Sequence, residues 1–171
     1  MTRERYFTAN WEWGCCGEPL RVGDQVELEV QYDSEYAQSM RSELASVLSE
    51  PLTGVETHHD DEVLTRYGRI LALDAVIAQT QWTVTPRMTP DPPLQDLGGG
   101  VFVSFGNAQP GQAEGVHKAG SGQLVPIVVV PDDAVEPEDS DPDLTVFGVQ
   151  TRPNLMGYVI TLEVAEGQDR S

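Results

Sequence analysis

The residues of this chain whose types could do chemistry together form two adjacent pairs, Cys15-Cys16 and His58-His59. Cysteine thiolate and imidazole are standard zinc ligands, and a structural zinc takes four of them in a tetrahedral array. Glycines at positions 14 and 17 flank the cysteine pair and let the backbone turn, so both sulfurs can approach one point. The pattern therefore predicts a structural metal site, with zinc as the candidate cofactor, whose ligands are Cys15, Cys16, His58 and His59.

Two other interpretations of the same four residues stay open. Recognised zinc motifs separate paired ligands by two or more residues, whereas both pairs here are adjacent. One cysteine can therefore be a small buried hydrophobe and the histidines ordinary loop residues. Alternatively, the protein is a metal- or thiol-dependent enzyme that uses Cys15/Cys16 with His58/His59, because catalytic partners need only be close in space. None of the familiar nucleotide-binding, hydrolase or metalloprotease motifs accompanies them.

The charge balance bears on the class of partner. The chain has 28 acidic and 10 basic residues, for a formal net charge of −18. A field of that sign repels phosphate backbones, so we do not expect nucleic acid as a direct partner. The excess of acid either keeps the protein soluble or attracts another protein with a basic surface. Two aromatic residues beside the cysteines, Trp11 and Trp13, are candidate binding residues for such a partner.

Length and hydropathy predict a single domain at residues 1–171 that does not enter a membrane. The chain has 171 residues, enough for one hydrophobic core. Its apolar runs are much shorter than the ~20 residues that span a bilayer, and the N-terminal residues contain no hydrophobic signal core. Two cysteines in a chain that is not secreted are expected to be reduced thiols, which places the protein in the cytoplasm.

Hydrophobic periodicity identifies the elements that position these residues. Apolar and polar residues alternate from 25 to 32, which predicts a half-buried strand. Helical spacing begins after Ser34, a candidate N-cap, and ends before Pro51. Residues 67–84 predict one long bent strand or two shorter ones. Further strands are expected at residues 6–13, 101–105, 123–130, 144–150 and 157–164, the last two around a turn at residues 152–154.

Three segments are expected to lack regular structure. Residues 85–100 are rich in proline and glycine, and residues 107–122 are rich in glycine and glutamine. Residues 131–143 carry seven acids in thirteen positions and should form a flexible acidic loop.

Six to eight short strands and one helix predict a mainly β fold. The expected architecture is a small antiparallel β-barrel or rolled sheet with one external helix and long loops. The turn at Gly23-Asp24 before a strand, and the glycine near the start of the strand at Gly68, are similar to features of SH3-like and OB-like barrels. Fold does not fix function, so these features assign no activity.

The N-terminal half resembles an uncharacterised bacterial family of small proteins. The resemblance consists of a Cys-Cys-Gly-x-Pro block at residues 15–19, a Val-Gly-Asp element at residues 22–24, the His58-His59 pair, and Gly68 before Ile70. That family has no assigned activity, so the resemblance implies no substrate. It does imply that the cysteines and histidines belong to one pattern.

These observations together predict a non-enzymatic β-barrel protein-interaction module with a candidate structural metal site. Its partner is expected to be another protein with a basic surface, recognised through exposed aromatic and acidic residues.

Overall fold

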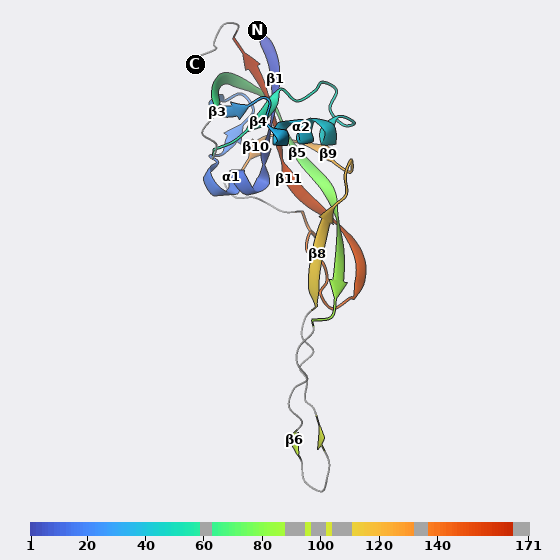
Figure 1. The fold of residues 1–171 in the computed structure, drawn as a ribbon. Helices are drawn as coiled ribbons and strands as arrows, with labels where there is room; N and C mark the ends of the chain where they lie inside the picture. Colours follow the sequence, from blue (N-terminus) through green and yellow to red (C-terminus); the bar gives the residue numbers. More distant parts are fainter. Residues whose placement is uncertain (59–62, 88–94, 97–101, 104–110, 132–136, 166–171) are drawn as a thin grey trace.

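The computed structural model describes residues 1–58, 63–87, 95–96, 102–103, 111–131 and 137–165 (Figure 1). Strands account for 55% of the described residues and helices for 12%, which confirms the predicted mainly β class. The described residues contain two helices rather than the one predicted. Neither of these described helices is long and apolar enough to span a membrane.

Five strands close the main sheet into a ring. Their order is β11 (Gly148–Val164), β1 (Thr2–Ala9), β4 (Gly54–Glu56), β3 (Gln25–Gln31), β5 (Leu64–Thr85) and back to β11. β1 and β4 run parallel, through the pairs Tyr6–Gly54 and Phe7–Val55, whereas the other neighbours in the ring are antiparallel. The sheet is therefore mixed, and the prediction of an antiparallel arrangement is wrong at the β1–β4 pair.

The long strand predicted at residues 67–84 is confirmed, because β5 runs unbroken for 22 residues. The turn predicted at residues 152–154 is wrong, because β11 runs through it for 17 residues. β11 pairs with β5 from Gly148–Val84 to Val164–Gly68, with register shifts after Leu155 and Thr161. Pro153 lies within β11 and has no backbone N–H to donate to a neighbouring strand. It is tolerated because, among the described residues, the edge of β11 that faces away from β5 pairs with β1 only from Gly157 onward.

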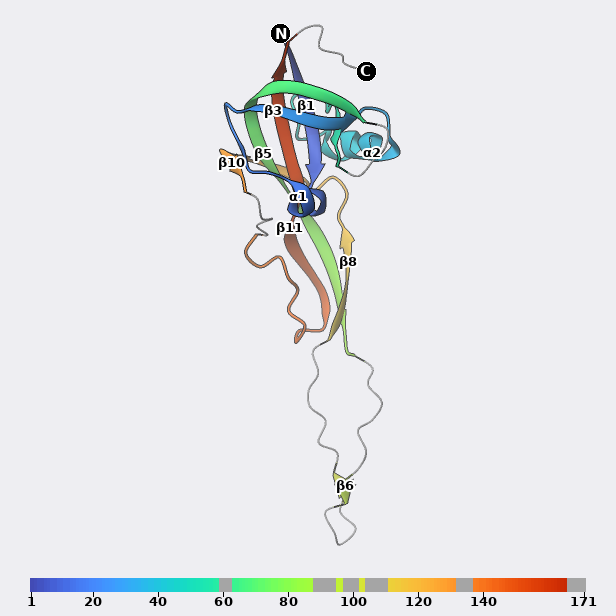
Figure 2. The same cartoon turned by 90° about the vertical axis from the view of Figure 1, so that its left-hand side faces the viewer.

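Beyond the ring, β5 and β11 continue as an arm. One edge of β5 pairs in turn with β3, with β9 (Gln123–Ile127) and with β8 (Gln112–His117). We call residues 80–85 of β5, the whole of β8 and residues 148–152 of β11 the arm; Figure 1 and Figure 2 both show it projecting from the ring. The expectation of an irregular loop at residues 107–122 is therefore wrong at β8, where cross-strand pairing outweighs a weak local pattern.

Two hydrophobic clusters lie on opposite faces of the ring strands. One faces inward and includes Tyr6, Leu28, Val30, Ile70, Leu73, Tyr158, Ile160 and Leu162. The other lies under α2 (Glu35–Leu44) and includes Phe7, Met40, Leu44, Val55, Val76 and Val159. α2 therefore covers the ring from outside, as predicted. Its N-cap is also confirmed, because the Ser34 hydroxyl accepts a 3.1 Å hydrogen bond from the Ala37 N–H.

The strand expected at residues 6–13 is confirmed only in part. β1 ends at Ala9, and α1 (Asn10–Cys16) follows it directly. Gly17 ends α1 where the chain passes against Trp13: a Cβ at this position would lie 2.3 Å from the indole. Glycine is therefore required in the Cys-Cys-Gly block because of packing.

The remaining elements are short. β2 (Leu20–Arg21) pairs with β10 (Val129–Val130), and β6 (Gln95–Asp96) pairs with β7 (Phe102–Val103). The strand predicted at residues 123–130 is present as β9 and β10, but only Val130 in it is fully buried, so the expectation of a mostly buried strand is wrong. Within the predicted acidic loop, residues 132–136 lie outside the described residues, and Pro137–Asp143 contain no helix or strand.

Candidate functional site

A buried carboxylate fastens α1 to the end of β4. The Glu12 side chain is on α1 and only 2% of the residue is exposed. One of its oxygens, Oε1, accepts hydrogen bonds from the Thr57 hydroxyl and, at 2.7 Å, from the His58 backbone N–H. These two hydrogen bonds tie the helix to the chain leaving β4.

A second buried carboxylate lies beside the first. Glu56 ends β4 and is 0% exposed, and its Oε1 lies 2.9 Å from Nε2 of His58. Among the described residues, no group donates a well-aligned hydrogen bond to either oxygen of Glu56. Burial raises the pKa of Glu56; the Thr8 hydroxyl and the His58 ring lower it, and the charges of Glu12 and Glu29 raise it.

This cluster of Glu12, Glu56, Thr57 and His58 was missed by sequence reasoning, which treats glutamates as solvated surface residues. Two carboxylates with different environments are an arrangement that enzymes use for acid and base chemistry. Glu12 and Glu56 are 2% and 0% exposed, whereas the His58 side chain keeps 28% exposure. The hydrogen bonds of Glu12 to Thr57 and His58 hold α1 and the end of β4 together.

The predicted metal ligands are described only in part. Cys15 is an exposed residue on α1, and His58 lies against Glu56. The side chain of Cys16 and the whole of His59 lie outside the described part of the structure. Within the described residues, no group of three or more His, Cys, Asp or Glu side chains is arranged to hold a metal ion.

The two candidate binding tryptophans have opposite environments. Trp11 is 68% exposed, whereas Trp13 is 2% exposed and belongs to the inward-facing hydrophobic cluster. The indole Nε1 of Trp13 donates a 2.9 Å hydrogen bond to the carbonyl of Pro131. Trp13 is therefore not part of an exposed aromatic surface, and it anchors α1 to the chain that follows β10.

The arm has one face that is solvated throughout. Cross-strand partners point to the same face of a sheet, and alternate residues along a strand share it. The rows of this face are Gln112 with Thr85; Glu114, Thr83 and Val149; and Val116, Gln81 and Thr151. All eight residues are exposed, although Val116 and Val149 are apolar.

An acidic segment is hydrogen-bonded to the arm. The Leu144 carbonyl accepts a hydrogen bond from the N–H of Gly111, next to the start of β8. Gln150 of β11 bonds both the N–H and the carbonyl of Asp143. From residue 138 to residue 150 the chain has four acids and no lysine or arginine, and it also exposes Val146 and Phe147. Apolar and acidic side chains therefore share the surface at the end of the arm.

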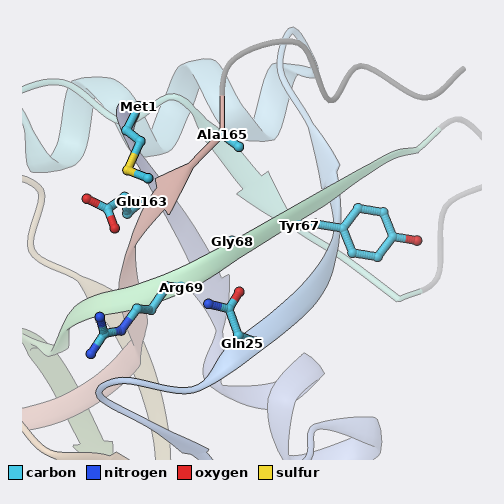
Figure 3. A pocket seen from close by; sticks show the side chains of 7 residues that line it. All are labelled: Met1, Gln25, Tyr67, Gly68, Arg69, Glu163 and Ala165. Carbon is cyan, nitrogen blue, oxygen red and sulfur yellow. The ribbon is translucent and has the colours of Figure 1, made fainter.

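The opposite end of the ring has a hollow of about 370 Å³. Figure 3 shows it around Gly68, with side chains from β3, β5, β11 and the N-terminus, and with Tyr67 directed away from Arg69. Gly68 allows β5 to lie close to β11, because a Cβ at this position would be 2.9 Å from the Glu163 carbonyl oxygen. Arg69 and Tyr67, which line it, are exposed to water.

A family profile decides the relationship of this chain to known proteins. The profile of a family of unknown function, DUF6578, matches residues 2–164. The chain belongs to the DUF6578 family. This confirms the prediction of an uncharacterised family. No curated protein and no solved structure matches the chain.

The DUF6578 match covers the ring, both helices and the arm, from β1 to the end of β11. The arm therefore lies within the matched region and is not an addition at one end of the chain. The family description assigns no activity, so the function must be argued from the surface and the sites of this chain.

Proposed function

We propose that this protein is a non-catalytic interaction domain that binds another protein with a basic surface, using its arm and the adjoining acidic segment. The observation that carries the proposal is the combination of exposed Phe147, Val146 and Val149 with the acids that precede them. Exposed apolar residues grouped beside polar ones are typical of protein-binding surfaces, and aromatic residues are enriched there.

The sign of the charge favours a basic partner. The acids at positions 138, 139, 141 and 143 are exposed, and Glu114 lies on the solvated face of the arm. Together with the net charge of −18 they attract cationic surfaces and speed encounter with them, and they disfavour nucleic acid.

The test compares partners captured by the wild-type chain and by a Phe147→Asp, Val149→Asp double variant from cells that express the protein. We expect a basic protein that is lost with the double variant and retained by Val22→Asp, which changes an exposed valine away from the arm. Binding of the purified partner should weaken as salt rises. A partner set that is the same for both variants would contradict the proposal.

A structural metal ion held by Cys15, Cys16, His58 and His59 is a second candidate, on a different part of the molecule. The contact between His58 Nε2 and Glu56 favours it, because metal-binding histidines commonly place the second ring nitrogen against a carboxylate. His58 would then bind zinc through Nδ1. Zinc at one equivalent in the freshly purified, reduced chain, and its loss from Cys16→Ser and His58→Ala, would support this candidate; wild-type protein without zinc would end it.

A further inference from the structure

The solvated face of the arm leads without interruption into an apolar groove. Along one face of β5 the residues pass from exposed to buried in the order Thr85, Thr83, Gln81, Gln79, Ile77, Ala75 and Leu73. The same face of β11 passes from exposed Val149 and Thr151 through half-buried Pro153 to buried Leu155. A chain lying along this face would therefore reach apolar surface where the arm joins the ring.

The groove itself holds about 310 Å³. Its floor is formed by Ala75 and Ile77 of β5 and by Leu155 and Tyr158 of β11. Leu155 and Tyr158 share this face although they are three residues apart, because the register shift after Leu155 inserts one extra residue. The floor is continuous with the inward-facing hydrophobic cluster, against which Ile77 also packs.

The walls of the groove come from a different part of the chain. They are Ile127 of β9, Val129 of β10, Pro131 and Pro137. None of the eight described residues that line the groove is charged. An apolar group placed against these residues would be stabilised by about 25 cal/mol for each Å² it buries.

The chain that leaves the groove at Pro137 is acidic. Pro137 lines the groove, and the next two residues, Glu138 and Asp139, are exposed carboxylates. An occupant must therefore be apolar at its centre and is favoured if its flanks are basic. A second copy of this chain does not meet that requirement, because each copy has a net charge of −18 and the two repel.

We infer that the groove between Ile77, Leu155 and Ile127 is the anchor pocket of the proposed interaction, and that it takes one large apolar side chain of an extended partner segment flanked by lysine or arginine. The inference rests on the proposed function and adds the recognition element to it. The volume, about 310 Å³, is at the low end of ligand pockets, which suits one side chain rather than a cofactor. Buried aromatic or aliphatic anchors of this kind carry most of the energy in many interfaces.

The experiment titrates the full chain with a defined probe, a short peptide that has a central tryptophan, threonines beside it and lysines at both ends. We expect the peptide to shift the methyl resonances of Ile77, Ile127 and Leu155. Replacing the tryptophan by alanine should weaken binding about tenfold or more. Methyl resonances that do not move, or an affinity that does not depend on the tryptophan, would overturn the inference.

Two variants and two outcomes separate the pocket from the wider proposal. Ala75→Leu fills the groove and should weaken binding of the peptide about tenfold, whereas Val128→Leu adds bulk at a neighbouring residue that is 77% exposed and should leave binding unchanged.

If the peptide binds only the arm, with shifts at Val149 and none in the groove, the proposed function stands and the pocket does not. A matched peptide with glutamates in place of the lysines tests the charge. If the two peptides bind the groove equally well, the pocket stands and the preference for a basic partner does not. Dimerisation through the groove in sedimentation experiments would overturn the pocket as a partner site.

Discussion

Leu155 of β11 lies directly opposite Ile77 of β5, at the point where the exposed face of the arm becomes the floor of the apolar groove. Leu155 is almost completely buried, while Val149, six residues earlier on the same face, is 64% exposed. One continuous strand pair therefore serves both as a solvated surface and as part of the hydrophobic core.

This gradient predicts unequal costs for similar substitutions along one strand. Leu155→Ala should lower the free energy of unfolding by about 3 kcal/mol, because it removes buried methyl groups and leaves a cavity. Val149→Ala should change it by about 0.5 kcal/mol or less, because that side chain is solvated. Urea unfolding followed by circular dichroism measures both. Equal costs at the two positions would show that the arm is packed against something along its whole length.

The buried Glu56 predicts a dependence of stability on pH. Burial raises its pKa above the ordinary 4.5, so the protonated form is favoured in the fold. The contribution of Glu56 to the stability of the fold is therefore fully present below pH 4.5 and is lost as the pH rises through the raised pKa. Glu56→Gln does not titrate, so the variant should be more stable than wild type at neutral pH and equal to it in acid.

Thermal unfolding of wild type and Glu56→Gln between pH 3 and pH 8 tests this expectation. Glu18→Gln is the matched control, because Glu18 is exposed and its replacement should leave the pH profile unchanged. A variant that is less stable than wild type at neutral pH would mean that the contacts of the Glu56 carboxylate, among them the one with His58, outweigh the cost of burying its charge.

Glu12 is predicted to be needed for the attachment of α1. Glu12→Ala removes the acceptor of the Thr57 hydroxyl and of the His58 N–H and should cost about 3 kcal/mol. Glu12→Gln keeps a side-chain oxygen and should recover a good part of that loss. Both values come from chemical unfolding curves, and a Glu12→Ala protein within about 0.5 kcal/mol of wild type would remove Glu12 from the account of the fold.

Gly157 is predicted to be irreplaceable where β11 passes the end of β1. A Cβ at Gly157 would lie 2.0 Å from the carbonyl oxygen of Thr8, so Gly157→Ala should cost about 3 kcal/mol or prevent folding. Gly120→Ala is the comparison, because nothing lies within 4 Å of its Cβ position and only its left-handed backbone is strained, at about 1 kcal/mol. The melting temperature of Gly157→Ala should therefore be lower than that of Gly120→Ala.

Local patterns in the sequence determined a large part of the fold. Three local patterns are confirmed: the alternation at residues 25–32, of which β3 covers Gln25–Gln31, the N-cap at Ser34 and the β-branched run of β5. Such patterns are reliable because the periods of a strand and of a helix are set within a few residues. The same patterns cannot show which strands become neighbours, so the parallel β1–β4 pair was not foreseen.

The candidate sites depended on the tertiary structure to a greater extent. The residue types of Trp11 and Trp13 are identical, and only the packing of α1 exposes the first and buries the second. Glu12 and Glu56 are 44 positions apart in the sequence and meet because α1 folds against the end of β4.

The sequence by itself therefore determined the class of fold, the acidic charge and the elements with strong periodicity, because those properties are sums or local repeats of residue types. Only the tertiary structure decided that β11 continues through Pro153, since the hydrogen bonds that hold it come from β5, some seventy residues away. It also created the groove between Ile77, Ile127 and Leu155, because burial depends on contacts between segments that no local pattern connects.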